Sequence, residues 1–288
     1  MQPLAVTRTA HSMPLSIAAL ALVVGLAIGS FLNVCIHRIP AGQSIVWPGS
    51  RCPACAAPIA WYDNIPLVSW LRLGGRCRAC HEPIAARYPV IEALTGGLAV
   101  LSLWRFGTTP WAIVAFAFSC AMLVVSLIDV DEGIIPDVIT LPGILIGLAV
   151  SMLVPGGVGV WDAVAGACLG GGLLWAVAAA YQRAAGIEGL GLGDVKLLAM
   201  IGAFLGWQSI PAVLLIASLT GSVGGIAIML GRRGRSRAGR VLRSLGPAAL
   251  FRHLRRTPLP FGPFLALGAV TALYIPELAL PWGWVSSG

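Results

Sequence analysis

The stretch Gly189-Leu-Gly-Leu-Gly-Asp-Val-Lys196 places one carboxylate, that of Asp194, directly before a long apolar run that begins at Val195. Glycine adopts backbone conformations that other residues avoid, and Asp is a preferred residue at the start of a helix. Asp194 is therefore expected to cap a helix over 195–207, at the edge of a membrane span. This pattern fits a simple helix cap behind a flexible loop as well as a functional carboxylate with Gly191, Gly193 and Lys196 as its supporting residues.

The composition places the whole chain in a membrane. Of its 288 residues, 58% are hydrophobic and 10% are charged, and the mean hydropathy is +0.88. These values lie outside the range of soluble globular domains, and crossing about 30 Å of hydrocarbon takes roughly 20 apolar residues. The sequence predicts an all-α polytopic membrane protein with eight transmembrane helices, at about 14–36, 89–104, 111–128, 138–154, 160–181, 195–208, 211–231 and 259–280.

The basic residues give the orientation, because cytoplasmic loops concentrate Lys and Arg. With the N-terminus outside, 17 of the 19 basic residues fall in inside loops, and the exceptions are Arg8 and Arg105. The net charge of +8 is then mostly a signal of topology and gives no reason to expect nucleic acid as a partner. The nine Arg between 232 and 256 are also placed to touch anionic lipid headgroups.

Four cysteines form a short internal repeat in the first inside loop. The segment CPACAAPIA from Cys52 and the segment CRACHEPIA from Cys77 match at six of nine positions. Two C-x-x-C pairs are typical of tetrahedral zinc, and a loop of this size buries too little apolar surface to fold without such a metal. The sequence predicts zinc held by Cys52, Cys55, Cys77 and Cys80. Four thiolates leave no open position for water, so this zinc is expected to be structural, with His81 outside the ligand set.

A second group of acids follows the predicted third span, in Leu127-Ile-Asp-Val-Asp-Glu-Gly-Ile-Ile-Pro-Asp137. Asp131 and Glu132 are expected to face water, and Asp137 is placed to cap the next span. Asp129 lies on the last turn of its span. That span runs inward and the one after Asp194 runs outward, so both carboxylates should meet at the cytoplasmic face. Two adjacent carboxylates that share one proton form the arrangement of aspartic proteases, one acting as base and the other as acid.

Three further features concern packing. The small residues from Gly166 to Gly172 favour a close helix contact rather than a nucleotide site. Asn33 is expected to donate a hydrogen bond to a neighbouring helix. Glu92, within a turn of the inner boundary, is expected to pair with Arg87.

Several motifs together resemble one family. They are GSFLNV with Arg38 and Pro40, the two C-x-x-C pairs, NIPLVSW from 64, ARYPVIEALTG from 86, LIDVDEGIIPD from 127, GLGDVKLLAMIGAFLGW from 191 and PFGPF from 260. In this order they resemble the bacterial type IV prepilin peptidases, which are GxGD-type intramembrane aspartic proteases. The resemblance implies an inner-membrane enzyme that removes the basic leader of type IV prepilins and pseudopilins at the cytoplasmic face, with Asp129 and Asp194 as its catalytic pair.

The resemblance also implies a second activity and a domain plan. Longer members of the family carry the four-cysteine loop and methylate the new N-terminal amine with S-adenosylmethionine. The expected regions are a periplasmic N-terminus with the first span (1–37), a cytoplasmic zinc-knuckle loop domain (38–88) and a transmembrane peptidase core (89–288). The core includes an Arg-rich cytoplasmic loop at 232–257 that is longer than the family pattern leads us to expect.

Two other functions fit parts of the sequence. A protease like signal-peptide peptidase would use the same chemistry on other membrane substrates, and only the cysteine loop and its flanking motifs argue against it. An ion-coupled transporter would also use intramembrane Asp residues. It predicts acids near the middle of the bilayer and an inverted repeat, whereas the acids here cluster at one face.

Overall fold

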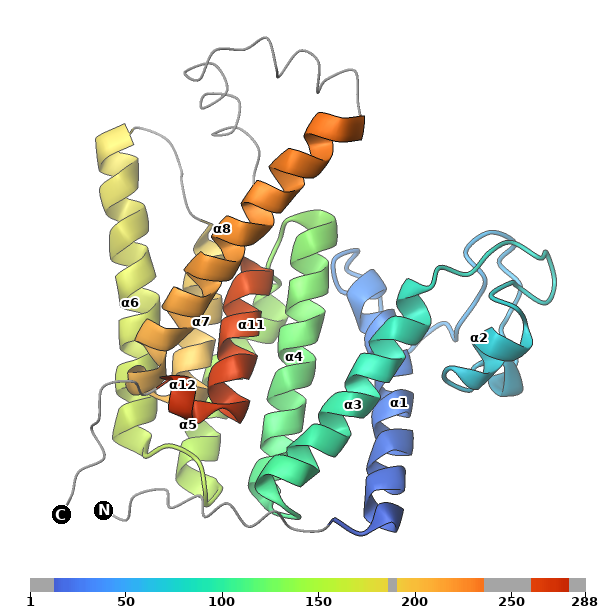
Figure 1. The fold of residues 1–288 in the computed structure, drawn as a ribbon, viewed down its shortest axis with the longest axis horizontal. Coiled ribbons are helices and arrows are strands. Elements are labelled where there is room, and N and C mark those ends of the chain that lie inside the picture. The colour runs from blue at the N-terminus through green and yellow to red at the C-terminus, as the bar shows by residue number, and fades with distance from the viewer. Residues whose placement is uncertain (1–12, 186–190, 236–259, 280–288) are drawn as a thin grey trace. The chain divides into compact units, whose positions relative to one another are not determined.

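The computed structural model describes residues 13–185, 191–235 and 260–279, and these residues are almost entirely helical (Figure 1). Within these ranges extended pairing is limited to two isolated bridges, Arg51 with Pro58 and Arg76 with Pro83. The predicted all-α class is confirmed. The longer helices are α1 (Leu15–Arg38), α3 (Arg87–Phe106), α4 (Pro110–Glu132), α5 (Asp137–Leu153), α6 (Val160–Ala185), α7 (Leu192–Leu205), α8 (Ile210–Arg235) and α11 (Gly262–Tyr274). The short ones are η1 (Trp61–Asp63), α2 (Val68–Arg72), η2 (Trp207–Ser209) and α12 (Pro276–Ala279).

Each apolar segment predicted as a span contains most of one of the longer helices, and the last, 259–280, is divided between α11 and the short α12. Among the described residues, five segments are long and apolar enough to cross a membrane: α1, α3, α4, nearly all of α6, and Trp207–Ile226. Helices α5, α7 and α11 have 17, 14 and 13 residues, fewer than the roughly 20 of a full crossing. The chain is a multi-pass membrane protein, and the number of eight crossings stays a prediction. Gly189 and most of the Arg-rich loop lie outside the described residues.

Tertiary contacts divide the chain into two compact units. The first takes in the chain up to Ile128 together with Ala149–Gly157, and the second takes in Asp129–Leu148 and Val158–Gly283. The four cysteines therefore belong to the first unit, and Asp129 and Asp194 both belong to the second. The three regions expected from the sequence stay a prediction.

In the first unit, α1 and α3 approach closely because glycines line their contact. A Cβ atom added to Gly25 would lie 2.7 Å from the Cβ of Ala99, and one added to Gly29 would lie 2.7 Å from the Cα of Glu92. Small residues of this kind let two membrane helices pack backbone to backbone. The contact also satisfies Asn33 of α1, whose Nδ2 donates to the carbonyl of Tyr88 on α3 at 3.2 Å, as predicted.

In the second unit, α7 is largely enclosed, with Leu197, Leu198 and Ile201 fully buried. On one side, Gly202 of α7 packs directly against Gly166 of α6. The small-residue face predicted from the sequence is therefore a helix contact. On another side, Gly143 and Gly147 of α5 leave room for Met200 and Phe204 of α7. These contacts give a short helix a fixed place, and its N-terminus carries Asp194.

The buried carboxylate of Glu92 joins the cysteine loop to the helices of the first unit. Its Oε2 accepts the backbone N–H of Leu67 at 2.8 Å, and the side chain of Ser30 on α1 hydrogen-bonds to the same carboxylate. Leu67 precedes α2 and has a φ of 59°, a conformation that is unusual for Leu. The predicted partner was Arg87, whereas the hydrogen bonds described for Glu92 come from Leu67 and Ser30.

We expect Glu92→Ala to loosen this attachment, because it leaves the Leu67 N–H without its acceptor. The free energy of unfolding should fall by about 1–3 kcal/mol, and limited proteolysis in detergent should cut the cysteine loop faster. Glu92→Gln keeps an acceptor oxygen and should lose less. Glu82→Ala is the matched control, because Glu82 is exposed; an equal change in both Ala variants would contradict this role for Glu92.

Candidate active site

Asp129 occupies the last turn of α4, where its side chain is buried with 6% of the residue exposed. The helix ends at Glu132, and Gly133 follows with a φ of 68°, which glycine adopts readily. The Gly133 N–H donates to the carbonyl of Asp129 at 2.9 Å. The carboxylate of Asp129 accepts a different donor, the backbone N–H of Gly262, at 2.9 Å from Oδ2. The first residue of α11 therefore holds the carboxylate of Asp129 on the last turn of α4.

Asp194 lies at the other end of a helix, in the first turn of α7. The expectation that it caps this helix was wrong: α7 begins at Leu192, Gly191 is the N-cap residue, and no side chain caps the helix. Asp194 is therefore the third helical residue. Its Oδ1 is buried and has no hydrogen-bond partner among the described residues. Freed from capping, this oxygen is available to a proton or a substrate.

The structure brings Asp129 and Asp194 together in the second unit, close enough for their charges to interact. Neither acid has an Arg or Lys partner among the ion pairs of the described residues. By contrast, Asp131 and Glu132 are exposed. Of the acids in the LIDVDEGIIPD segment, Asp129 is the buried one, and its charge interacts with that of Asp194.

Gly191, Gly193 and Lys196 were expected to support Asp194, and the structure gives each of them a different role. Gly191 has φ −70° and ψ 140°, an ordinary extended conformation, so its backbone freedom is not used. Gly193 is required by space, because an added Cβ would lie 2.8 Å from the Cβ of Ile135. Lys196 makes an ion pair with Asp137, with Nζ at 2.7 and 2.8 Å from the two carboxylate oxygens. Asp137 was expected to cap α5, and it instead ties the start of α5 to α7.

Two contacts at this site were not found from the sequence. In the sequence, Gly262 stood out only as part of the PFGPF motif, and Ile135 only as part of the LIDVDEGIIPD segment. Gly262 is distant in sequence from both acids, and its contact with Asp129 joins residues 133 positions apart. Ile135 is near Asp129 in sequence but distant from Asp194. The one local signal was the glycine between two prolines at Pro260–Pro263, which marks a point of close backbone approach.

The four predicted cysteine ligands gather in the first unit, with all four Sγ atoms within 4.8 Å of one another. The Sγ atoms of Cys52 and Cys80 are 3.8 Å apart, and four sulfurs at about 2.3 Å from a tetrahedral zinc would lie roughly 3.8 Å apart. Backbone N–H groups of Cys80 and Ala79 lower the pKa of the Cys77 thiol to about 7. The backbone N–H of Glu82 lowers the pKa of the Cys80 thiol, but burial and the neighbouring thiols outweigh it and raise that pKa, so of these two Cys77 more readily supplies the thiolate that a metal requires. The donor set therefore fits a metal ion of the zinc type.

The two halves of this cluster have the same backbone, which confirms the internal repeat. In the first half, the N–H of Cys52 donates to the carbonyl of Ala57, and the N–H of Ala56 to that of Cys52. In the second, Cys77 donates to Glu82 and His81 donates to Cys77. Ala56 and His81 both take a positive φ, at 57° and 58°. His81 thus serves the turn of the second half, and it lies outside the group of possible ligands.

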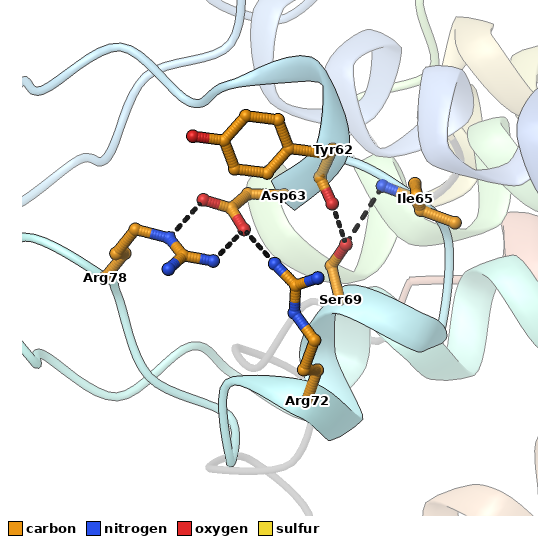
Figure 2. A network of polar contacts seen from close by, with 6 residues as sticks. All are labelled: Tyr62, Asp63, Ile65, Ser69, Arg72 and Arg78. Carbon is orange, nitrogen blue, oxygen red and sulfur yellow. Dashed lines mark hydrogen bonds and ion pairs between the residues drawn. The ribbon is translucent and has the colours of Figure 1, made fainter.

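Figure 2 shows a polar network that braces the second half against the segment before it. Arg78, between Cys77 and Cys80, donates from Nε and Nη2 to the two carboxylate oxygens of Asp63, each at 2.6 Å, and Arg72 of α2 adds a longer bond at 3.3 Å. The Arg78 hydrogen bond holds the pKa of Asp63 below its usual range. The network ties the Cys77–Cys80 turn to Asp63 and to α2.

Comparison with known proteins matches the cysteine region and the acidic region to two different family models. The Bacterial Peptidase A24 N-terminal domain matches residues 23–106, which include the four cysteines. The Type IV leader peptidase family matches residues 116–226, which include Asp129 and Asp194. No solved structure matches the chain.

Curated relatives cover most of the chain. A prepilin leader peptidase/N-methyltransferase of Burkholderia pseudomallei (strain 1026b) is 38% identical, over 89% of this chain and 84% of its own. One of Aeromonas hydrophila is 37% identical, over 95% and 96%, and one of Myxococcus xanthus is 46% identical, over 74% and 64%. The fold and the pair of acids, one buried and one half-buried, define a multi-pass membrane protein with an acidic site. The chain belongs to the type IV leader peptidase family, as its motifs indicated.

We predict that the chain holds about one zinc ion and that the Cys52→Ser/Cys77→Ser double variant loses it, because two thiolates cannot hold a structural zinc. Elemental analysis of freshly purified, reduced protein measures the metal, and limited proteolysis should show the variant's loop cut faster. Cys168→Ser is the matched control, because this exposed cysteine is outside the cluster. A metal-free wild-type chain, or a variant that keeps its zinc, would refute the prediction.

Proposed function

We propose that this chain is a membrane aspartic endopeptidase that removes the leader peptide of type IV prepilins and pseudopilins and then methylates the new N-terminal residue. Its relatives are named for both activities, and the leader peptidase family match covers both acids. The observation that carries the proposal is the pairing of Asp129 with Asp194, from the end of α4 and the start of α7, with one buried oxygen of Asp194 unpartnered.

The two acids can divide the chemistry of hydrolysis between them. Asp129, whose Oδ2 accepts a backbone N–H, would be the carboxylate that takes a proton from water. The hydroxyl would add to the carbon of the scissile carbonyl while Asp194, holding the shared proton, protonates its oxygen. The C–N bond then breaks as Asp129 returns its proton to the leaving amine and Asp194 takes a proton back from one hydroxyl of the tetrahedral diol, which restores the singly protonated pair. The products are a leader with a new carboxylate and a pilin with a new N-terminal amine.

The side of the membrane follows from the charge distribution. With 17 of 19 basic residues assigned to inside loops, the ends of α4 and α7 that carry the acids would face the cytoplasm. A prepilin has its basic leader on that side and its apolar helix in the bilayer, so the bond between them would reach the depth of Asp129 and Asp194. The proposed location is therefore the bacterial inner membrane, with the active site at the cytoplasmic boundary.

The proposed metal and methyl donor serve other steps. Zinc on Cys52, Cys55, Cys77 and Cys80 would hold the loop between α1 and α3 in its fold, and it supplies no water for hydrolysis. The donor for the second activity would be S-adenosylmethionine, which the family resemblance implies. The new amine released by cleavage is the group that this activity would modify.

We expect Asp129→Asn and Asp194→Asn each to reduce leader cleavage to background, because each removes one member of a pair that acts as a unit. Purified variants would be incubated with a synthetic prepilin and S-adenosylmethionine, and mass spectrometry would follow loss of the leader and gain of a methyl group. Asp131→Asn, which changes an exposed acid, is the matched control and should retain most of its activity. Substantial cleavage by either paired variant would refute the assignment. An inactive Asp131→Asn with an active Asp129→Asn would show that Asp131 pairs with Asp194.

A further inference from the structure

Ile135 touches the backbone beside both acids of the pair. It lies in the turn between α4 and α5, within the second unit. A Cβ atom added to Gly193 would be 2.8 Å from the Cβ of Ile135 and 3.5 Å from its Cδ1, and one added to Gly262 would be 3.3 Å from the same Cδ1. One side chain thus fills the space over two glycines that are distant in sequence.

Each of these glycines is directly connected to one acid of the pair. Gly193 directly precedes Asp194 in the chain, and Gly262 donates its N–H to Asp129. A Cβ on Gly262 would also lie 2.7 Å from Oδ2 of Asp129, so the backbone, Ile135 and the carboxylate are already in tight contact. Any movement of Ile135 therefore changes the space available to the supports of both carboxylates.

The turn that carries Ile135 is itself fixed at both ends. At its start, the Gly133 N–H donates to the carbonyl of Asp129. At its end, Asp137 binds Lys196, which follows Asp194 by two positions. The Lys196 and Asp137 side chains are 33% and 55% exposed, and such pairs contribute only about 0–1 kcal/mol. The ion pair therefore helps to align the start of α5 with α7. The apolar contact of Ile135 determines how closely the backbones at Gly193 and Gly262 approach each other.

We propose that Ile135 is a positioning residue that sets the separation of Asp129 and Asp194. The inference rests on the proposed function, in which these two acids share a proton and act on one carbonyl. Sharing a proton requires their oxygens to lie within hydrogen-bond distance, about 2.5–3.0 Å. A misplacement of about 1 Å in an active site can cost roughly a hundredfold in rate.

The experiment compares two adjacent isoleucines of the same turn. Ile135→Ala keeps the Cβ next to Gly193 but removes Cγ1 and Cδ1, and with Cδ1 the contact with Gly262, whereas Ile134→Ala changes a neighbour that is 48% exposed. Ile135→Val keeps the β-branch at Gly193 and loses only the Cδ1 methyl. We expect kcat for leader cleavage to fall tenfold to a hundredfold in Ile135→Ala with KM within about twofold, because the residue acts on the acids and not on substrate binding. Ile134→Ala should match the wild type, and Ile135→Val, which keeps the packing on Gly193 and loses the Cδ1 contact with Gly262, should have a rate between those of the wild type and Ile135→Ala.

Thermal unfolding in detergent, measured on the same samples, separates positioning from general packing. A wild-type kcat in Ile135→Ala would overturn the proposal, as would equal losses in the two Ala variants or a loss no greater than the unfolded fraction at the assay temperature. Failure of the proposed function looks different, because Asp129→Asn or Asp194→Asn would then remain active. If both Asn variants are inactive while Ile135→Ala cleaves at the wild-type rate, only the role of Ile135 is refuted.

Discussion

A buried carboxylate needs a hydrogen-bond donor, and Asp129 obtains its donor from the backbone of Gly262. The end of α4 offers only unpaired carbonyls to an acid on its last turn, so the N–H must come from another helix. The start of α11 supplies it, and the close approach excludes any side chain at position 262. This one bond fixes α11 against the end of α4, and α8 packs on α11 through Gly268, which contacts Val213.

The two units are held together by different kinds of contact. In the second unit, glycines on α5, α6 and α7 allow backbones to meet, so a helix of 14 residues is enclosed and presents Asp194 at a fixed depth. The first unit has the same kind of contact between α1 and α3. Its loop depends instead on four clustered thiols, on the Asp63 and Arg78 ion pair (Figure 2) and on the buried Glu92. A loop with little core is thus held by polar contacts and a metal-binding set.

The sequence predicted the features that depend on local pattern. Apolar runs predicted the long helices, repeated C-x-x-C spacing predicted the thiol cluster, and the small residues near Gly166 predicted the contact of α6 with α7. What it missed depends on contacts between distant segments. Asp194 was expected to be a cap because composition alone does not fix where α7 begins, and the starts of helices shift by a turn with tertiary packing. The contacts of Gly262 and Ile135 with the acidic pair appear only when α4, α7 and α11 are brought together.

The central claim is that Asp129, and not Asp131, pairs with Asp194. Its test is cross-linking of the Asp129→Cys/Asp194→Cys variant with the shortest bifunctional thiol reagent, in a background that replaces Cys35, Cys120 and Cys168 by Ala. Mass spectrometry of proteolytic fragments would identify the joined peptides. The account predicts an efficient intramolecular link between positions 129 and 194 and little between 131 and 194 in the matched Asp131→Cys/Asp194→Cys variant. A link at 131 with none at 129 would contradict it.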